Sequence, residues 1–209
     1  MGTSLRRVNV HRAAVLAGGI ALVLCLGSAM FATEQPGRVE WQKAYRRPSE
    51  IPFPQSNPYS DAKLRLGKLM FFDPLLSGSN VRSCATCHNP GLSWGDGQAR
   101  AIGEGQKPLT LRSPTLLNVA WIPKLGWDGH FRDLESVAMG PITGIGNMNL
   151  PEKDLLGRLS GIPGYVDAFH AAFGKGEITR KKIELAFATF ERSIVSSDAP
   201  FDRHSRHPG

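Results

Sequence analysis

Apolar residues recur at helical spacing along the last part of the chain, after residue 150. Pro151 suits the start of a helix, and the acidic residues that follow it favour the first turn. Thr179 is a typical N-cap residue for the last helix. The apolar positions that follow each start are separated by three or four residues, as on one helix face. They are Leu155, Leu159 and Ile162, then Tyr165, Phe169 and Phe173, and finally Ile183, Phe187, Phe190 and Ile194. The pattern predicts helices whose apolar faces form much of the core.

An earlier helix is predicted from its capping residues and apolar positions. Ser60 can cap a helix over 61–72, and Asp73 with Pro74 would end it, because the residue before a proline avoids helical geometry. The apolar residues assigned to its buried face are Leu64, Leu69 and Phe72. After a loop, a short helix is expected to begin near Cys84.

The remaining segments lack regular periodicity. Residues 33–59 are rich in proline and polar groups and are predicted to form an extended lead-in with little regular structure. Residues 89–133 contain many Gly, Pro and Trp residues, and only a short candidate helix, Leu134–Met139, follows them. So long an irregular stretch is unusual in a small domain, but packing around a large apolar cofactor would account for it. Since no pattern indicates a strand ladder or an internal repeat, the predicted fold class is mainly α with long irregular loops.

The N-terminal residues 1–32 have the composition of a targeting segment. Basic residues precede an apolar run over 13–32, and Gly27-Ser28-Ala29 is a plausible cleavage site. The segment is either a cleaved signal peptide or an uncleaved membrane anchor, because about 20 apolar residues are long enough to span a bilayer. In both cases the rest of the chain is expected outside the cytoplasm, in the periplasm.

Net charge is a weak guide to partners. The 209-residue chain carries +7, but residues 1–29 hold three arginines and no acid. Without them, 22 basic side chains face 18 acidic ones, which leaves +4. No basic cluster is interleaved with aromatic residues, so nucleic acid is not an expected partner.

The chemistry of the chain is concentrated in one motif. Cys25 lies in the targeting segment, so Cys84 and Cys87 are the only cysteines of the remaining chain, and His88 follows them. This Cys-x-x-Cys-His spacing is typical of covalent c-type haem attachment, with the histidine as iron ligand. A redox dithiol would need a βαβ context, and a zinc site would need a second pair of ligands; neither is visible in the sequence.

Further motifs around this one resemble the bacterial di-haem cytochrome c peroxidase family, which also contains the di-haem enzyme of methylamine utilisation. The matching segments are Leu66-Gly67-Lys68, Phe71-Phe72-Asp73-Pro74, Ser77-Gly78-Ser79, Ser83 to Pro90, Trp94-x-Asp96-Gly97, Ser113 to Asn118, Trp127-Asp128-Gly129, Gly140-Pro141-Ile142, Pro163-Gly164-Tyr165 and Phe190 to Asp202. The resemblance implies a cytochrome c-like N-terminal haem domain over 60–203, with loops that wrap the haem, followed by a tail over 204–209.

The resemblance also implies roles for single residues. Family members reduce hydrogen peroxide, or use it to oxidise a partner protein, and a second haem domain receives electrons from a small donor protein. His88 matches the proximal ligand of the haem that meets peroxide. Trp127 matches a tryptophan placed between the two haems, with a core aromatic as the alternative. Arg112 matches an arginine beside the haem, near a propionate.

The sequence departs from the family in four respects. Only one haem attachment motif is present, so one covalent haem c is predicted. Ser113 replaces the asparagine expected near the calcium of the family, which makes calcium doubtful. Glu104 stands where a distal histidine blocks the iron in many members. Asn147 stands where a glutamate takes and returns the proton of peroxide, and an amide cannot shuttle a proton.

Two classes of function therefore remain open. The first is an enzyme of the cytochrome c peroxidase type, which reduces hydrogen peroxide with electrons from a small donor protein, and with a separate haem domain as a further partner. The second is a monohaem electron-transfer or peroxide-binding module, or a truncated product that lacks the second haem domain. Membrane contact is expected only if the N-terminal segment stays uncleaved.

Overall fold

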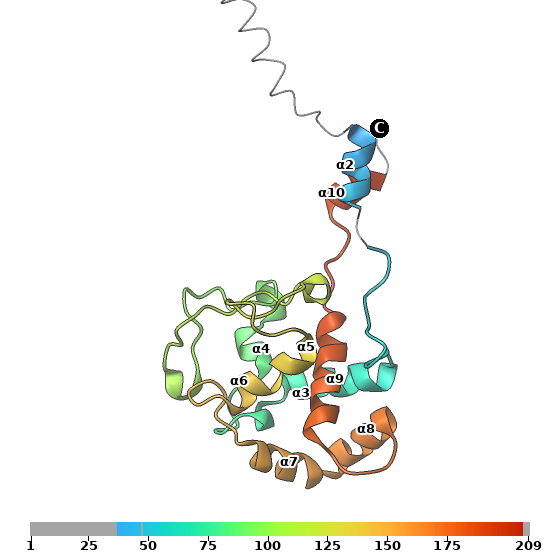
Figure 1. Cartoon of the computed structure of the whole chain (residues 1–209). Coiled ribbons are helices and arrows are strands. Elements are labelled where there is room, and N and C mark those ends of the chain that lie inside the picture. Colours follow the sequence, from blue (N-terminus) through green and yellow to red (C-terminus); the bar gives the residue numbers. More distant parts are fainter. Residues whose placement is uncertain (1–36, 47, 207–209) are drawn as a thin grey trace, which may run out of the picture. The chain divides into compact units, whose positions relative to one another are not determined.

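The computed structural model describes residues 37–46 and 48–206, and these residues form helices joined by long loops, with isolated β-bridges and no strand (Figure 1). The α-helices are α2 (Arg38–Ala44), α3 (Asp61–Phe72), α4 (Cys84–Cys87), α5 (Leu134–Val137), α6 (Met139–Thr143), α7 (Glu152–Ser160), α8 (Pro163–Phe173), α9 (Arg180–Arg192) and α10 (Pro200–Arg206). Short 3₁₀ helices are η1 (Pro74–Leu76), η2 (Pro90–Leu92), η3 (Glu104–Gln106) and η4 (Val119–Trp121). The mainly α fold class is confirmed.

The centre of the larger compact unit, Arg47–Pro200, is the packing of α3 against α9. Gly67 permits this close approach, because a Cβ there would lie 2.1 Å from the carbonyl oxygen of Ala186 in α9. α8 packs against α3, α5 packs against α9, and α7 packs against α8 (Figure 1). The core between these helices contains Leu66, Met70, Phe71, Leu155, Leu159, Phe169, Ile183 and Phe187, all almost fully buried.

The predicted bounds of α3 are confirmed, but its predicted buried face is wrong. Leu69 and Phe72 are 48% and 40% exposed, and Leu64 is only partly buried. The segment has apolar residues on most sides, so periodicity alone does not select one face. The buried face is instead the one that contains Gly67, the point where α3 closely approaches α9. The other buried residues lie on the same face as Gly67, at helical spacing from it. They are Lys63, Leu66, Met70 and Phe71.

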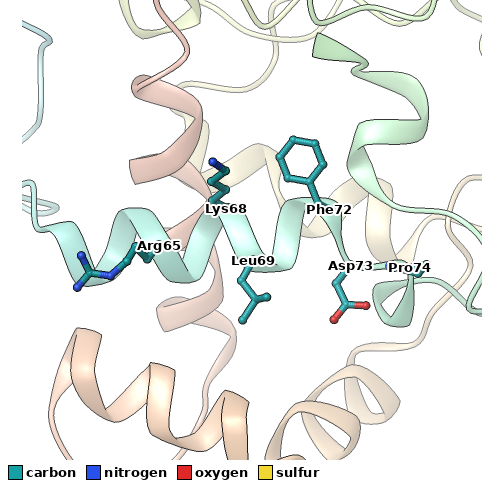
Figure 2. Close-up of a pocket in the computed structure, with 6 residues that line it drawn as sticks. All are labelled: Arg65, Lys68, Leu69, Phe72, Asp73 and Pro74. Carbon is teal, nitrogen blue, oxygen red and sulfur yellow. The ribbon is translucent and has the colours of Figure 1, made fainter. Parts of the chain in front are cut away.

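The outward surface of α3 forms an open hollow of about 640 Å³. Figure 2 shows Lys68 and Phe72 on one side of the helix, with Leu69 and Asp73 on the other. Asp73 is held in place there, because Tyr165 donates a hydrogen bond to its Oδ2 over 2.6 Å.

The C-terminal helices follow the sequence pattern closely. The side chain of Thr179 accepts a hydrogen bond from the backbone N–H of Lys182 at the start of α9. Pro151 is the N-cap of α7, which begins one residue later. Ile194 is buried although it lies two residues beyond α9.

The irregular stretch over 89–133 is closed by three antiparallel bridges. They join Asn89 to Gly95, Ile102 to Pro108 and Leu125 to Phe131. Each bridge ties together residues that lie six positions apart, so the stretch consists of short closed loops. The bridges give partners to backbone N–H and C=O groups that would otherwise be paired within longer helices.

The predicted lead-in is more ordered than expected. Residues 38–44 form α2, so the prediction of little regular structure is wrong there. Residues 48–59 belong to the larger compact unit, which begins earlier than the predicted domain over 60–203. Asn57 explains this, because its buried side chain donates hydrogen bonds to Glu135 in α5 and to the carbonyl oxygen of Leu185 in α9.

A second, smaller unit contains α2 and α10. The rings of Trp41 and Tyr45 stack with centroids 5.5 Å apart, and Tyr45 meets the edge of Phe201 at 6.2 Å. α10 extends to Arg206, so it includes the first three residues of the predicted tail. Aromatic contacts of this kind explain how two short helices associate.

The predicted targeting segment, 1–32, lies outside the described residues. Within the part of the chain that the structure describes, no helix combines the length and apolar character that a membrane crossing requires.

Candidate functional site

The two cysteines of the attachment motif lie on α4, a single helical turn. Ser83 starts the turn, and its backbone N–H donates to the hydroxyl of Thr86 over 3.0 Å. Cys84 and Cys87 are partly buried free thiols, and α4 packs against α3. Burial raises the pKa of the Cys84 thiol above its usual range, with a further rise from the nearby charge of Glu191. A reactive redox dithiol needs a depressed pKa, so this environment argues against a redox dithiol.

His88 is oriented by two backbone carbonyl groups. Its Nδ1 lies 3.2 Å from the carbonyl oxygen of Trp94 and 3.1 Å from that of Pro114. Two acceptors at one nitrogen fix the tautomer with the proton on Nδ1, which leaves the lone pair on Nε2 for a metal ion. Burial lowers the pKa of His88, so the imidazole stays neutral at physiological pH, as a metal ligand must.

Aromatic side chains pack behind the histidine. Phe71 lies 6.4 Å from the His88 ring, 5.9 Å from Trp94 and 5.1 Å from Phe190, measured between ring centroids. Phe72 also meets Trp94, at 6.4 Å, and is partly exposed. The cluster joins α3, α9 and the loop after α4, so the two core helices fix the position of His88.

The second cysteine is bordered by a different loop. Arg82 is buried, and its Nη2 lies 3.6 Å from the sulfur of Cys87 and donates to the carbonyl oxygen of Ile102. That carbonyl oxygen is 3.8 Å from the same sulfur. The loop that contains Glu104 therefore lies beside the attachment site. Sequence reasoning missed Arg82, because a single arginine in a loop carries no periodic or motif signal.

The residues predicted on the distal side are brought together by the backbone. The N–H of Glu104 lies 2.9 Å from the carbonyl oxygen of Gly146 and 2.8 Å from that of Asn147. Asn147 is partly buried, and its Cβ packs close to Gly144. Asn147, which stands at the position of the family glutamate, thus adjoins Glu104, a glutamate at the position of the family's distal histidine.

Trp127 and Arg112 also meet. The indole N–H of Trp127 donates to the carbonyl oxygen of Arg112 over 2.9 Å. Trp127 is 58% exposed, so the alternative of a core aromatic is wrong. Its placement between two haems, and that of Arg112 near a propionate, stay predictions.

The donor set fits a covalently attached haem. Two unpaired thiols lie one helical turn apart, and the imidazole that follows them keeps one nitrogen free while its other nitrogen is held by carbonyl groups. Among residues 37–46 and 48–206, no three His, Cys, Asp or Glu side chains gather in a metal-binding group. The motifs around Trp94 and Pro114 acquire a physical role here, because they supply the carbonyl groups that orient His88.

Fold and site together describe a helical domain whose two thiols and oriented imidazole fit a c-type haem. The chain belongs to the di-haem cytochrome c peroxidase family, whose model matches residues 61–208. Membership of this family implies haem c as the cofactor.

Similar proteins agree with this assignment. A methylamine utilization protein, MauG, of Methylorubrum extorquens is 43% identical over 192 residues, which cover 90% of this chain and 54% of that protein. Cytochrome c551 peroxidase of Pseudomonas aeruginosa is 36% identical over 157 residues, or 74% of this chain and 45% of that protein. The solved structure of a MauG-like protein associated with microbial copper homeostasis has a TM-score of 0.70 and 26% identity, covering 78% of this chain and 49% of its own. The chain spans about half the length of the curated relatives it matches.

Proposed function

We propose that this chain is a haem c peroxidase domain that reduces hydrogen peroxide with electrons from a small donor protein. One haem is attached through Cys84 and Cys87, and His88 is its proximal ligand. The observation that carries the proposal is the orientation of His88. Its Nδ1 faces the carbonyl oxygens of Trp94 and Pro114, and its Nε2 has no hydrogen-bond partner among residues 37–46 and 48–206. Hydrogen bonds from the other ring nitrogen to such acceptors raise the basicity of a metal-bound histidine.

When bound, the haem supplies the redox-active iron at which peroxide is reduced. The residues of the chain do the rest. The two thiols fix the haem covalently, and the ring cluster of Phe71, Trp94 and Phe190 excludes water behind His88. Trp127, exposed and anchored by its N–H, is suited to contact a separate haem domain or the donor protein. After export we place the domain in the periplasm.

A second function, a monohaem electron-transfer or peroxide-binding module, is favoured by one observation. Asn147 occupies the family's glutamate position, and its amide cannot take and return a proton. In this reading the haem site is open, but the breakage of peroxide is slow.

The test uses holoprotein made in a host with c-type maturation machinery. Acid–acetone extraction should leave the haem on the chain, and an iron assay should give one iron per polypeptide. Peroxide consumption is then measured with ascorbate as the reductant. Rapid turnover with a high-spin ferric spectrum supports the peroxidase. A high-spin spectrum with slow turnover supports the peroxide-binding module, and a six-coordinate low-spin spectrum without turnover supports the electron-transfer module. Release of free porphyrin would refute all three.

A further inference from the structure

Glu104 holds a buried carboxylate oxygen with no hydrogen-bond partner. Its Oε2 is inaccessible to solvent and pairs with no other group of the described residues. A carboxylate buried in this way is destabilising, because the free energy of hydration lost on folding is not replaced. Asp96 Oδ2 shares this property, but the other carboxylate oxygen of Asp96 accepts a hydrogen bond from Gln98. Each such group in a native structure calls for an explanation, and a catalytic role is one of them.

The backbone holds Glu104 firmly against the segment that contains Asn147. Besides the two hydrogen bonds from its N–H, the preceding Gly103 is buried and touches the same segment. A Cβ at position 103 would lie 1.9 Å from the carbonyl oxygen of Gly146, so only glycine allows the approach. Positions 104 and 147 are therefore held side by side by the backbone.

This region adjoins the haem attachment site. The carbonyl oxygen of Ile102 lies 3.8 Å from the sulfur of Cys87. Glu104 follows two residues later, so its Cα lies within about 7 Å of that of Ile102 along the chain. His88 is held from elsewhere, by the carbonyl groups of Trp94 and Pro114. A haem fixed to Cys87 would thus have the Glu104 loop as a neighbour. This loop is separate from the two carbonyl groups that hold His88.

We propose that Glu104 is the catalytic proton acceptor of this domain and replaces the carboxylate that Asn147 lacks. The proposal rests on the proposed function. Reduction of one hydrogen peroxide molecule to two water molecules consumes two electrons and two protons. The carboxylate takes the proton from the bound peroxide oxygen and returns it to the other oxygen, and this oxygen leaves as water when the O–O bond breaks. Glu104 ends unprotonated, the donor protein is oxidised by two electrons, and solvent supplies the two protons consumed.

The test measures proton acceptance by two routes. Ferric holoprotein is mixed with hydrogen peroxide, and separately with cyanide, which arrives as hydrogen cyanide and must lose its proton to bind. Glu104→Gln should slow both association rates by on the order of 10²-fold, since a positioned base contributes about 10²–10⁴-fold. The melting temperature should not fall, because glutamine keeps the size of the side chain and leaves the backbone contacts of position 104 unchanged. Glu104→Asp, which keeps the charge but withdraws it by one methylene, should slow both rates as well.

A swap provides the decisive comparison. Asn147→Glu in the Glu104→Gln background should restore much of both rates, whereas Asn147→Glu alone should add little. Glu184→Gln is the matched control, since this carboxylate is only 13% exposed and is paired with Arg180, and it should leave both rates unchanged. Rates that are indifferent to Glu104→Gln, or a large gain from Asn147→Glu alone, would overturn the assignment. If cyanide binding depends on Glu104 but peroxide is not consumed, the proposed function fails while the proton acceptor stands.

Discussion

Replacement of Glu135 by leucine should strongly destabilise the domain. Glu135 is buried and receives two hydrogen bonds from Arg192, at 2.7 and 2.9 Å, and one from Asn57 at 2.8 Å. Lys63 donates to the other side of Asn57 over 2.8 Å. Although burial alone would raise it, these hydrogen bonds hold the pKa of Glu135 below its usual value. Without the carboxylate, two buried cations remain with no anion between them.

The magnitude follows from the burial of the pair. Breaking a buried ion pair by removing one partner costs about 3–5 kcal/mol. At about 2–4 °C per kcal/mol for a protein of this size, the melting temperature should fall by roughly 6–20 °C. Because the folded-state pKa of Glu135 is depressed, its contribution is present above the unfolded-state pKa and is lost as the pH falls through the folded-state value. The difference between wild type and Glu135→Leu should therefore shrink in acid.

The assay is thermal and urea unfolding of the holoprotein, with a surface pair as control. Glu152 lies 2.9 Å from Arg180, but both side chains are substantially exposed, so Glu152→Ala should cost at most about 1 kcal/mol. The double variant Glu135→Leu with Arg192→Met should lose less than Glu135→Leu alone, because one stranded charge is removed. Equal losses for Glu135→Leu and Glu152→Ala would refute the reasoning.

Three further outcomes are expected. Cys84→Ala with Cys87→Ala should give protease-sensitive protein without haem, because ligand binding stabilises the native state; cooperative melting of that variant at the wild-type temperature would contradict this. Gly103→Ala should cost about 1–3 kcal/mol or more in urea unfolding, since its Cβ would meet the carbonyl oxygen of Gly146, and an unchanged midpoint would be the contrary result. Burial raises the pKa of Glu191 from 4.5 to about 8. The native state then retains a proton that the unfolded chain has released, so this stabilisation is complete below about pH 4.5 and is lost as the pH rises through about 8. Glu191→Gln should flatten this part of the stability curve; an unaltered curve would show that Glu191 does not titrate there.

The sequence was informative where one short-range signal determines the structure. The bounds of α3 and the Thr179 cap of α9 follow from capping residues alone. The attachment motif is equally local, because its spacing is set by the haem and not by the rest of the chain. For these elements the neighbours in sequence are also the neighbours in space.

The features that sequence reasoning missed depend on distant contacts. The buried face of α3 is chosen by the approach of Gly67 to α9, more than a hundred residues later in the chain. Asn57 reads as a loop residue, yet it joins Lys63 to Glu135 and brings residues 48–59 into the domain. The proximity of Glu104 to Asn147 depends in the same way on two segments that meet only in the folded chain.

The closed loops over 89–133 affect how readily this scaffold can acquire new specificities. Each loop is tied at its own base, by the bridges Asn89–Gly95, Ile102–Pro108 and Leu125–Phe131. Because the two ends of each loop are already joined by a bridge, an insertion at the tip of the loop carries only a small entropic penalty. It also leaves the pairing of the adjacent loop unchanged. Natural variation or directed evolution can thus alter one of these loops at a time. The middle loop, which carries Glu104, is where a single exchange at its tip would most directly reset the chemistry.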